Sequence, residues 1–112
     1  MNTSIPPTAD FIADLTYYTT ERGGRQGYAK SGIRPHVKFP FSTYLTSGQQ
    51  TFLDRDIVYP GEKVRAAIKI IATEKFSQQL SEGMTFEFGE GSRTTGTGII
   101  AEIINEQLRK PS

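Results

Sequence analysis

Cysteine is absent from this sequence, and histidine occurs once, as His36. Without thiols the chain cannot form disulfides, use a cysteine nucleophile or hold zinc in a cysteine-ligated site. A serine–histidine–aspartate triad would have to use His36, which lies between Pro35 and Val37 with no serine motif beside it. We therefore expect no metal and no cofactor, and a histidine that lies on the surface or makes a structural hydrogen bond.

Long apolar runs are also missing. The longest apolar stretches span about four residues, whereas a helix that crosses a bilayer needs about 20. Residues 1–10 carry no positive charge ahead of an apolar segment, so no signal peptide is expected. The sequence thus predicts a soluble, cytoplasmic protein without a membrane partner.

Charge of one sign is not in excess, because 13 basic residues stand against 12 acidic ones. This balance excludes the global basic field of a strong nucleic-acid binder. The basic residues are unevenly placed, however: residues 22–38 hold five of them and no acidic residue. Arginines beside glycine-exposed backbone N–H groups suit phosphate contacts, and a solvated charged loop is the open alternative.

The alternation of apolar and polar residues predicts the secondary structure. Strand-like segments lie at residues 11–18, 33–41, 64–72 and 84–88, with shorter ones at 50–53 and 99–104. Alanines leave a helix as the alternative for 64–72, and residues 74–82 are interpreted as one helical turn or an ordered loop. Turns are expected at 46–48 and 59–62. Five or six short strands without a long helix indicate an all-β protein, either a small barrel or a sandwich.

Two patterns are candidates for enzyme chemistry. The glycine-rich run at 89–98 has no lysine after it, so a hairpin connection with glycines at bulges is favoured over a phosphate loop. Asp54 and Asp56 straddle Arg55, but nothing near them indicates the burial that general acid–base catalysis requires. We therefore expect that the protein is not an enzyme.

Three motifs resemble the C-terminal (third) domain of translation elongation factor Tu. The first is Glu-Arg-Gly-Gly-Arg at 21–25 followed by Gly-Ile-Arg-Pro at 32–35. The second is Val-Tyr-Pro-Gly-Glu at 58–62, and the third is the glycine-rich run at 89–98. Their order and spacing nearly match those of the family, over residues 11–104.

The resemblance implies a small six-stranded antiparallel β-barrel that does no chemistry and contacts the T stem of aminoacyl-tRNA. We expect a flexible arm at 1–10, the barrel at 11–104 and a C-terminal tail at 105–112. By resemblance, the RNA-facing positions are Arg25, Gln26, His36, Thr46 and Gly91. The basic segment and the glycine run add Arg22, Lys30, Arg34 and Arg93.

The sequence departs from the family at residues 26–30, where Gln-Gly-Tyr-Ala-Lys replaces His-Thr-Pro-Phe-Phe. A chain of 112 residues also has no room for the family's GTPase, so we expect it to bind no nucleotide by itself. The leading hypothesis is a stand-alone binding module for RNA (tRNA-like) or a translation-associated protein. The alternative is a protein–protein interaction module, a mimic of the third domain that docks on a protein or self-associates. Its anchors would be Tyr17, Tyr18, Tyr28 and Tyr44.

Overall fold

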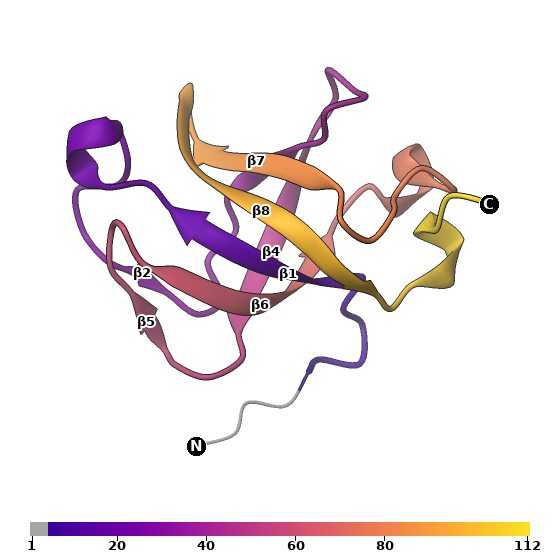
Figure 1. The fold of residues 1–112 in the computed structure, drawn as a ribbon, viewed down its shortest axis with the longest axis horizontal. Helices are drawn as coiled ribbons and strands as arrows, with labels where there is room; N and C mark the ends of the chain where they lie inside the picture. Colours follow the sequence, from indigo (N-terminus) through magenta and orange to yellow (C-terminus); the bar gives the residue numbers. More distant parts are fainter. Residues whose placement is uncertain (1–4) are drawn as a thin grey trace.

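The first strand, β1 (Phe11–Tyr17), pairs with two other strands at once, which closes the sheet on itself (Figure 1). The other barrel strands are β3 (His36–Lys38), β4 (Leu45–Phe52), β6 (Lys63–Ile70), β7 (Thr85–Glu90) and β8 (Arg93–Ile103). A computed structural model describes residues 5–112, and within them six antiparallel strands follow the order β1-β6-β4-β3-β7-β8. The expected six-stranded all-β barrel is therefore confirmed, and closure excludes the sandwich.

Alternate residues of each strand fill the barrel because successive side chains point to opposite faces. In β1, Phe11 and Leu15 are buried whereas Asp14 is exposed. Tyr17 is only 2% exposed, so its expected role as a surface anchor is wrong. Its hydroxyl donates a hydrogen bond to Gln50 Oε1, and its ring packs edge-on against Phe88 at 4.9 Å between centroids. Burial raises the pKa of the Tyr17 hydroxyl well above its usual value.

The glycine-rich run at 89–98 is mostly strand rather than loop. Only Gly91 and Ser92 connect β7 to β8, and a bulge falls between Phe88 and Gly89 as expected for this run. A Cβ atom added at Gly98 would overlap the ring of Phe86. Glycine therefore occurs in β8 because aromatic rings of β7 lie directly against the β8 backbone. The local sequence pattern does not reveal this contact between two strands.

The turn expected at 46–48 is wrong, because these residues lie inside β4. Gly48 is there for packing: a Cβ atom would lie 2.6 Å from Val37 Cγ2. The chain instead turns at Pro40 and Phe41, where Ser42 N–H donates to the Phe39 carbonyl at 3.2 Å. In the segment at 64–72, residues 64–70 belong to β6, so the expected strand is confirmed over the helix alternative up to Ile70.

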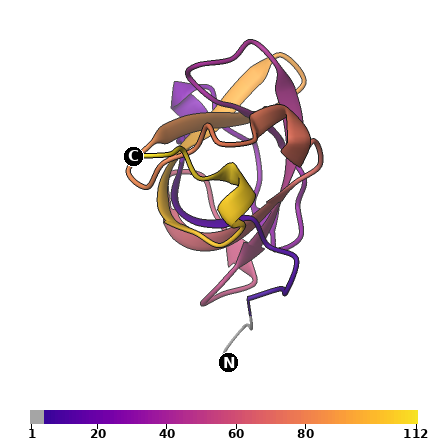
Figure 2. The ribbon, with the colours of Figure 1, turned by 90° about the vertical axis from the view of Figure 1, so that its right-hand side faces the viewer.

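Short 3-10 helices account for the helical residues of the described chain: η1 (Thr20–Arg22), η2 (Thr73–Phe76) and η3 (Glu106–Leu108). The segment after η2 and the η3 region join one end of the barrel, shown in Figure 2, where Leu80 N–H donates to the Leu108 carbonyl at 2.8 Å. Both leucines are fully buried. The helical turn expected within residues 74–82 is thus η2, which covers only the start of that segment.

Near the N-terminus the chain also joins the barrel. Residues 1–4 of the expected arm lie outside the described part of the chain. Asp10 is buried, and its carboxylate accepts hydrogen bonds from Ile70 N–H at 2.8 Å and from Asn105 Nδ2 at 3.0 Å. These bonds connect the segments before β1 and after β8 to the C-terminal end of β6.

Outside the barrel lies a two-stranded ribbon of β2 (Ala29–Lys30) and β5 (Ile57–Val58), with Ala29 paired to Val58. Together with η1 and the β7–β8 turn, this ribbon occupies the left side of Figure 1. Most of the predicted site residues lie in or beside these elements.

Candidate nucleic-acid interface

The Gly23–Gly24 pair shapes the loop that carries Arg25. Gly23 caps η1 with a φ of 94°, a conformation that glycine adopts without steric cost. A Cβ atom at Gly24 would overlap the Tyr18 carbonyl and lie 2.8 Å from the Thr19 carbonyl oxygen. The loop can therefore fold back tightly only with glycine here. It brings Arg25 next to the β7–β8 turn.

Arg25 is held by three acceptors. Its Nη1 donates to the Glu90 carboxylate, its Nη2 to the Tyr28 carbonyl at 3.0 Å, and its Nε to the Gly27 carbonyl at 3.4 Å. The side chain keeps 23% of its surface exposed. Arg25 is thus an oriented cation at the surface, but Glu90 offsets its charge.

Arg25 lines an open depression of about 470 Å³ that also contains Gln26, Ser92 and Arg93. Arg93 Nη1 donates to the Gly24 carbonyl at 3.4 Å, which ties this loop to β8. Thr95 lies in the same lining, and its buried hydroxyl has no hydrogen-bond partner among residues 5–112. This depression therefore offers an anion two guanidinium groups, the Gln26 amide and the Ser92 hydroxyl, although the Glu90 carboxylate belongs to the same lining.

On the other side of the β7–β8 turn, His36 and Lys38 line a second depression of about 270 Å³ with Gly91 and Ser92. His36 is opposite Ser47 of β4 and Gly89 of β7 in the sheet register. It lies on the outer face, since its neighbour Val37 is 1% exposed and points into the core. Ser92 lines both depressions, so the two depressions meet at the β7–β8 turn.

Lys30 extends this surface toward the β2–β5 ribbon. It lines a third open depression, of about 490 Å³, together with Arg25, Tyr28, Ser31 and Ile33. Arg25 is common to the first and third depressions. We call Lys30, Arg25, Arg93, His36 and Lys38 the basic band.

The other predicted residues lie outside the basic band. Arg22 is exposed in η1 with its guanidinium 4.8 Å from the Tyr18 ring centroid. Arg34 lines a separate depression beside Lys69 of β6. Thr46 is 6% exposed, and its hydroxyl oxygen accepts a hydrogen bond from Ala72 N–H at 3.3 Å. The structure thus brings together Arg25, Gln26, Lys30, His36, Gly91 and Arg93.

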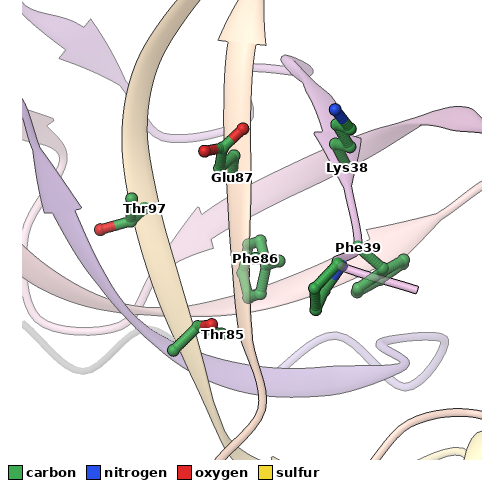
Figure 3. Close-up of a pocket in the computed structure, with 7 residues that line it drawn as sticks. Lys38, Phe39, Thr85, Phe86, Glu87 and Thr97 are labelled. Carbon is green, nitrogen blue, oxygen red and sulfur yellow. The ribbon is translucent and has the colours of Figure 1, made fainter. Parts of the chain in front are cut away.

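The sequence prediction missed the acidic side of this surface. Glu90 pairs with Arg25 although 65 positions separate them. Glu87 of β7 is opposite Lys38 of β3 in the register and opposite Thr97 of β8. Figure 3 shows this row of three side chains across neighbouring strands, above a depression that also contains Phe39 and Phe86. The basic segment at 22–38 is therefore partly neutralised by β7, which no local pattern indicates.

Of the two aspartates considered for catalysis, Asp56 lies beside the basic band, because its carbonyl accepts a hydrogen bond from Ser31 N–H at 2.8 Å. Asp54 forms an ion pair with Arg55 at 3.2 Å, and hydrogen bonding to this guanidinium lowers the pKa of the Asp54 carboxyl. A carboxyl group with a lowered pKa stays ionised and is a poor general acid. Residues 5–112 contain no group of three or more histidine, aspartate or glutamate side chains placed to hold a metal ion.

None of the helices in residues 5–112 has the length and apolar character needed to cross a bilayer. Compared with models of known protein families, the sequence matches none of them.

Proposed function

We propose that this protein is a non-catalytic module that binds RNA of a helical, tRNA-like kind through the basic band, in a translation-associated role. One observation carries the proposal: cations from three separate parts of the chain surround a continuous run of open depressions. These parts are residues 25–30, strand β3 and the start of β8. Phosphate groups are recognised by such sets of oriented lysine and arginine side chains.

Three cations of the basic band form no ion pair within residues 5–112, and together with Arg25 they are the expected phosphate contacts. Among residues 5–112, no carboxylate oxygen lies within 4.0 Å of the charged nitrogens of Lys30, Lys38 or Arg93. Gly91, with a φ of 59°, adds exposed backbone at the turn between them. With Arg25, these side chains supply four cationic contacts. Four phosphate contacts on a duplex lower affinity on the order of 100-fold between 50 and 200 mM salt.

The test is a fluorescence anisotropy titration with labelled tRNA at several salt concentrations. Lys30→Ala and Arg93→Ala should each weaken binding and reduce the salt slope by about 0.9. Lys110→Ala is the matched control, because Lys110 is exposed at the far C-terminal end. The proposal fails if tRNA does not bind at low salt, or if the control weakens binding as much as the band variants.

A protein partner is the second candidate, and one observation favours it. Phe41 and Tyr44 are 42% and 50% exposed in the segment between β3 and β4, and neither lines the depressions of the basic band. Exposed aromatics of this kind are frequent anchors at protein interfaces. A pull-down with and without nuclease separates the two candidates: a partner that survives nuclease and is lost in Tyr44→Ala supports the protein interface.

A further inference from the structure

Two half-exposed tyrosines lie against each other next to the basic band. Tyr28 is 51% exposed and Tyr59 is 55% exposed, and their ring centroids are 6.0 Å apart with the ring planes at 64°. Tyr28 precedes Ala29 of β2 and Tyr59 follows Val58 of β5, and these two strand residues are paired. The tyrosines therefore form a cross-strand pair that extends the ribbon by one position.

The ribbon directs both rings outward. Ala29 is 1% exposed and Val58 is 0% exposed, so this face of the ribbon packs on the barrel. Because side chains alternate along a strand, Tyr28 and Lys30 share the opposite face with Tyr59. Lys30 follows Tyr28 by two positions, a spacing of about 7 Å along an extended chain. Aromatic surface and a cation are thus presented side by side.

The backbone on both sides of the pair is fixed before any ligand binds. Arg25 Nη2 donates to the Tyr28 carbonyl at 3.0 Å. Tyr59 N–H donates to Glu62 Oε1 at 2.9 Å, within a turn where Gly61 has a φ of 92°. Because this backbone is already ordered, less conformational freedom is lost when a ligand stacks on the two rings.

The neighbours of the pair decide which ligand fits. Around Tyr28, the third depression combines two cations, Arg25 and Lys30, with little aliphatic surface, contributed by Ile33. A hydrophobic peptide would find few apolar partners here. A single-stranded nucleic acid presents flat bases beside negative phosphates, which complement the tyrosine rings and the cations of this surface. Such strands bind by stacking on aromatics along a basic groove.

We propose that the Tyr28–Tyr59 pair is a stacking site for an unpaired nucleobase of RNA, whose adjoining phosphate lies on Lys30. The inference rests on the proposed RNA binding and specifies it: the preferred ligand joins a helical segment to an unpaired strand. Stacking of one base on an aromatic side chain corresponds to a change in affinity of roughly 5- to 150-fold.

The test compares two labelled RNA probes by fluorescence anisotropy, a blunt-ended duplex and the same duplex with a short single-stranded extension. Wild-type protein should bind the extended probe more tightly by a factor in that range. Tyr28→Ala and Tyr59→Ala should remove this preference while duplex binding remains, and Tyr28→Phe should keep it because the ring is retained. Tyr44→Ala, which truncates a tyrosine that is 50% exposed elsewhere, is the control.

Equal affinity of the wild-type protein for both probes would overturn the stacking site and leave the proposed function standing. A preference that survives in both alanine variants would overturn the stacking site in the same way. Absence of binding to either probe, with a protein partner retained after nuclease, would overturn both proposals. The wild-type comparison uses no variant, so it decides the question even if a substitution prevents folding.

Discussion

Replacing Glu90 with glutamine should strengthen RNA binding. The Glu90 carboxylate accepts a hydrogen bond from Arg25, the cation at the junction of two depressions of the basic band. An RNA phosphate that contacts Arg25 would meet this carboxylate on the same guanidinium group. In Glu90→Gln the repulsion disappears, while the amide oxygen can still accept the hydrogen bond.

The magnitude is worked out for a phosphate that lies about 4 Å from the Glu90 carboxylate, the separation expected when both groups contact one guanidinium. Two like charges about 4 Å apart in water repel by about 1 kcal/mol, which corresponds to about a fivefold change in affinity. The Glu90 side chain is 45% exposed, so the effect should be largest at low salt and shrink as screening increases. An exposed ion pair contributes at most about 1 kcal/mol to folding, so the variant should remain folded.

The assay is anisotropy with labelled tRNA at low and high salt, beside thermal unfolding of each variant. Glu106→Gln is the matched control, because Glu106 also pairs with an arginine, Arg109, but does so at the C-terminal end. A gain of up to about fivefold that is confined to Glu90→Gln is expected. If Glu106→Gln gives the same gain, net charge alone explains it; if Glu90→Gln binds no better, Arg25 is not a phosphate contact.

Two further predictions concern the barrel itself. Gly98→Ala should lower the free energy of unfolding by about 1–3 kcal/mol in urea titrations, because its methyl group would overlap the Phe86 ring, whereas Gly27→Ala, with open space around it, should not. The raised pKa of buried Tyr17 means that the folded state retains this proton more tightly than the unfolded state. This contribution to stability is complete below the unfolded pKa of about 10 and is lost as the pH rises above it. Tyr17→Phe should be less stable at neutral pH by about 1–3 kcal/mol, since Gln50 loses its donor. Its stability should also fall less between pH 10 and 12, and an unchanged alkaline profile would show that Tyr17 does not cause it.

Several features of the candidate site were visible in the sequence, and others were not. The basic segment at 22–38 and the turn glycines pointed to Arg25, Lys30 and the β7–β8 connection. Thr46 was misjudged because a Thr-Ser-Gly run is typical of turns, whereas here Gly48 makes room for Val37 across the sheet. The interpretation of Tyr17 as exposed failed for a similar reason: its hydroxyl is satisfied by Gln50, a residue on another strand.

By itself, the sequence determined the all-β class, because a two-residue alternation can bury only one face of an extended strand. It also determined where the positive charge lies along the chain. Only the tertiary structure decided that β1 closes the barrel against β8, that Glu90 neutralises Arg25, and that Tyr28 meets Tyr59. Each of these contacts joins residues 31 or more positions apart. Such long-range contacts depend on the register and closure of the whole sheet, and a local sequence pattern does not specify either of them.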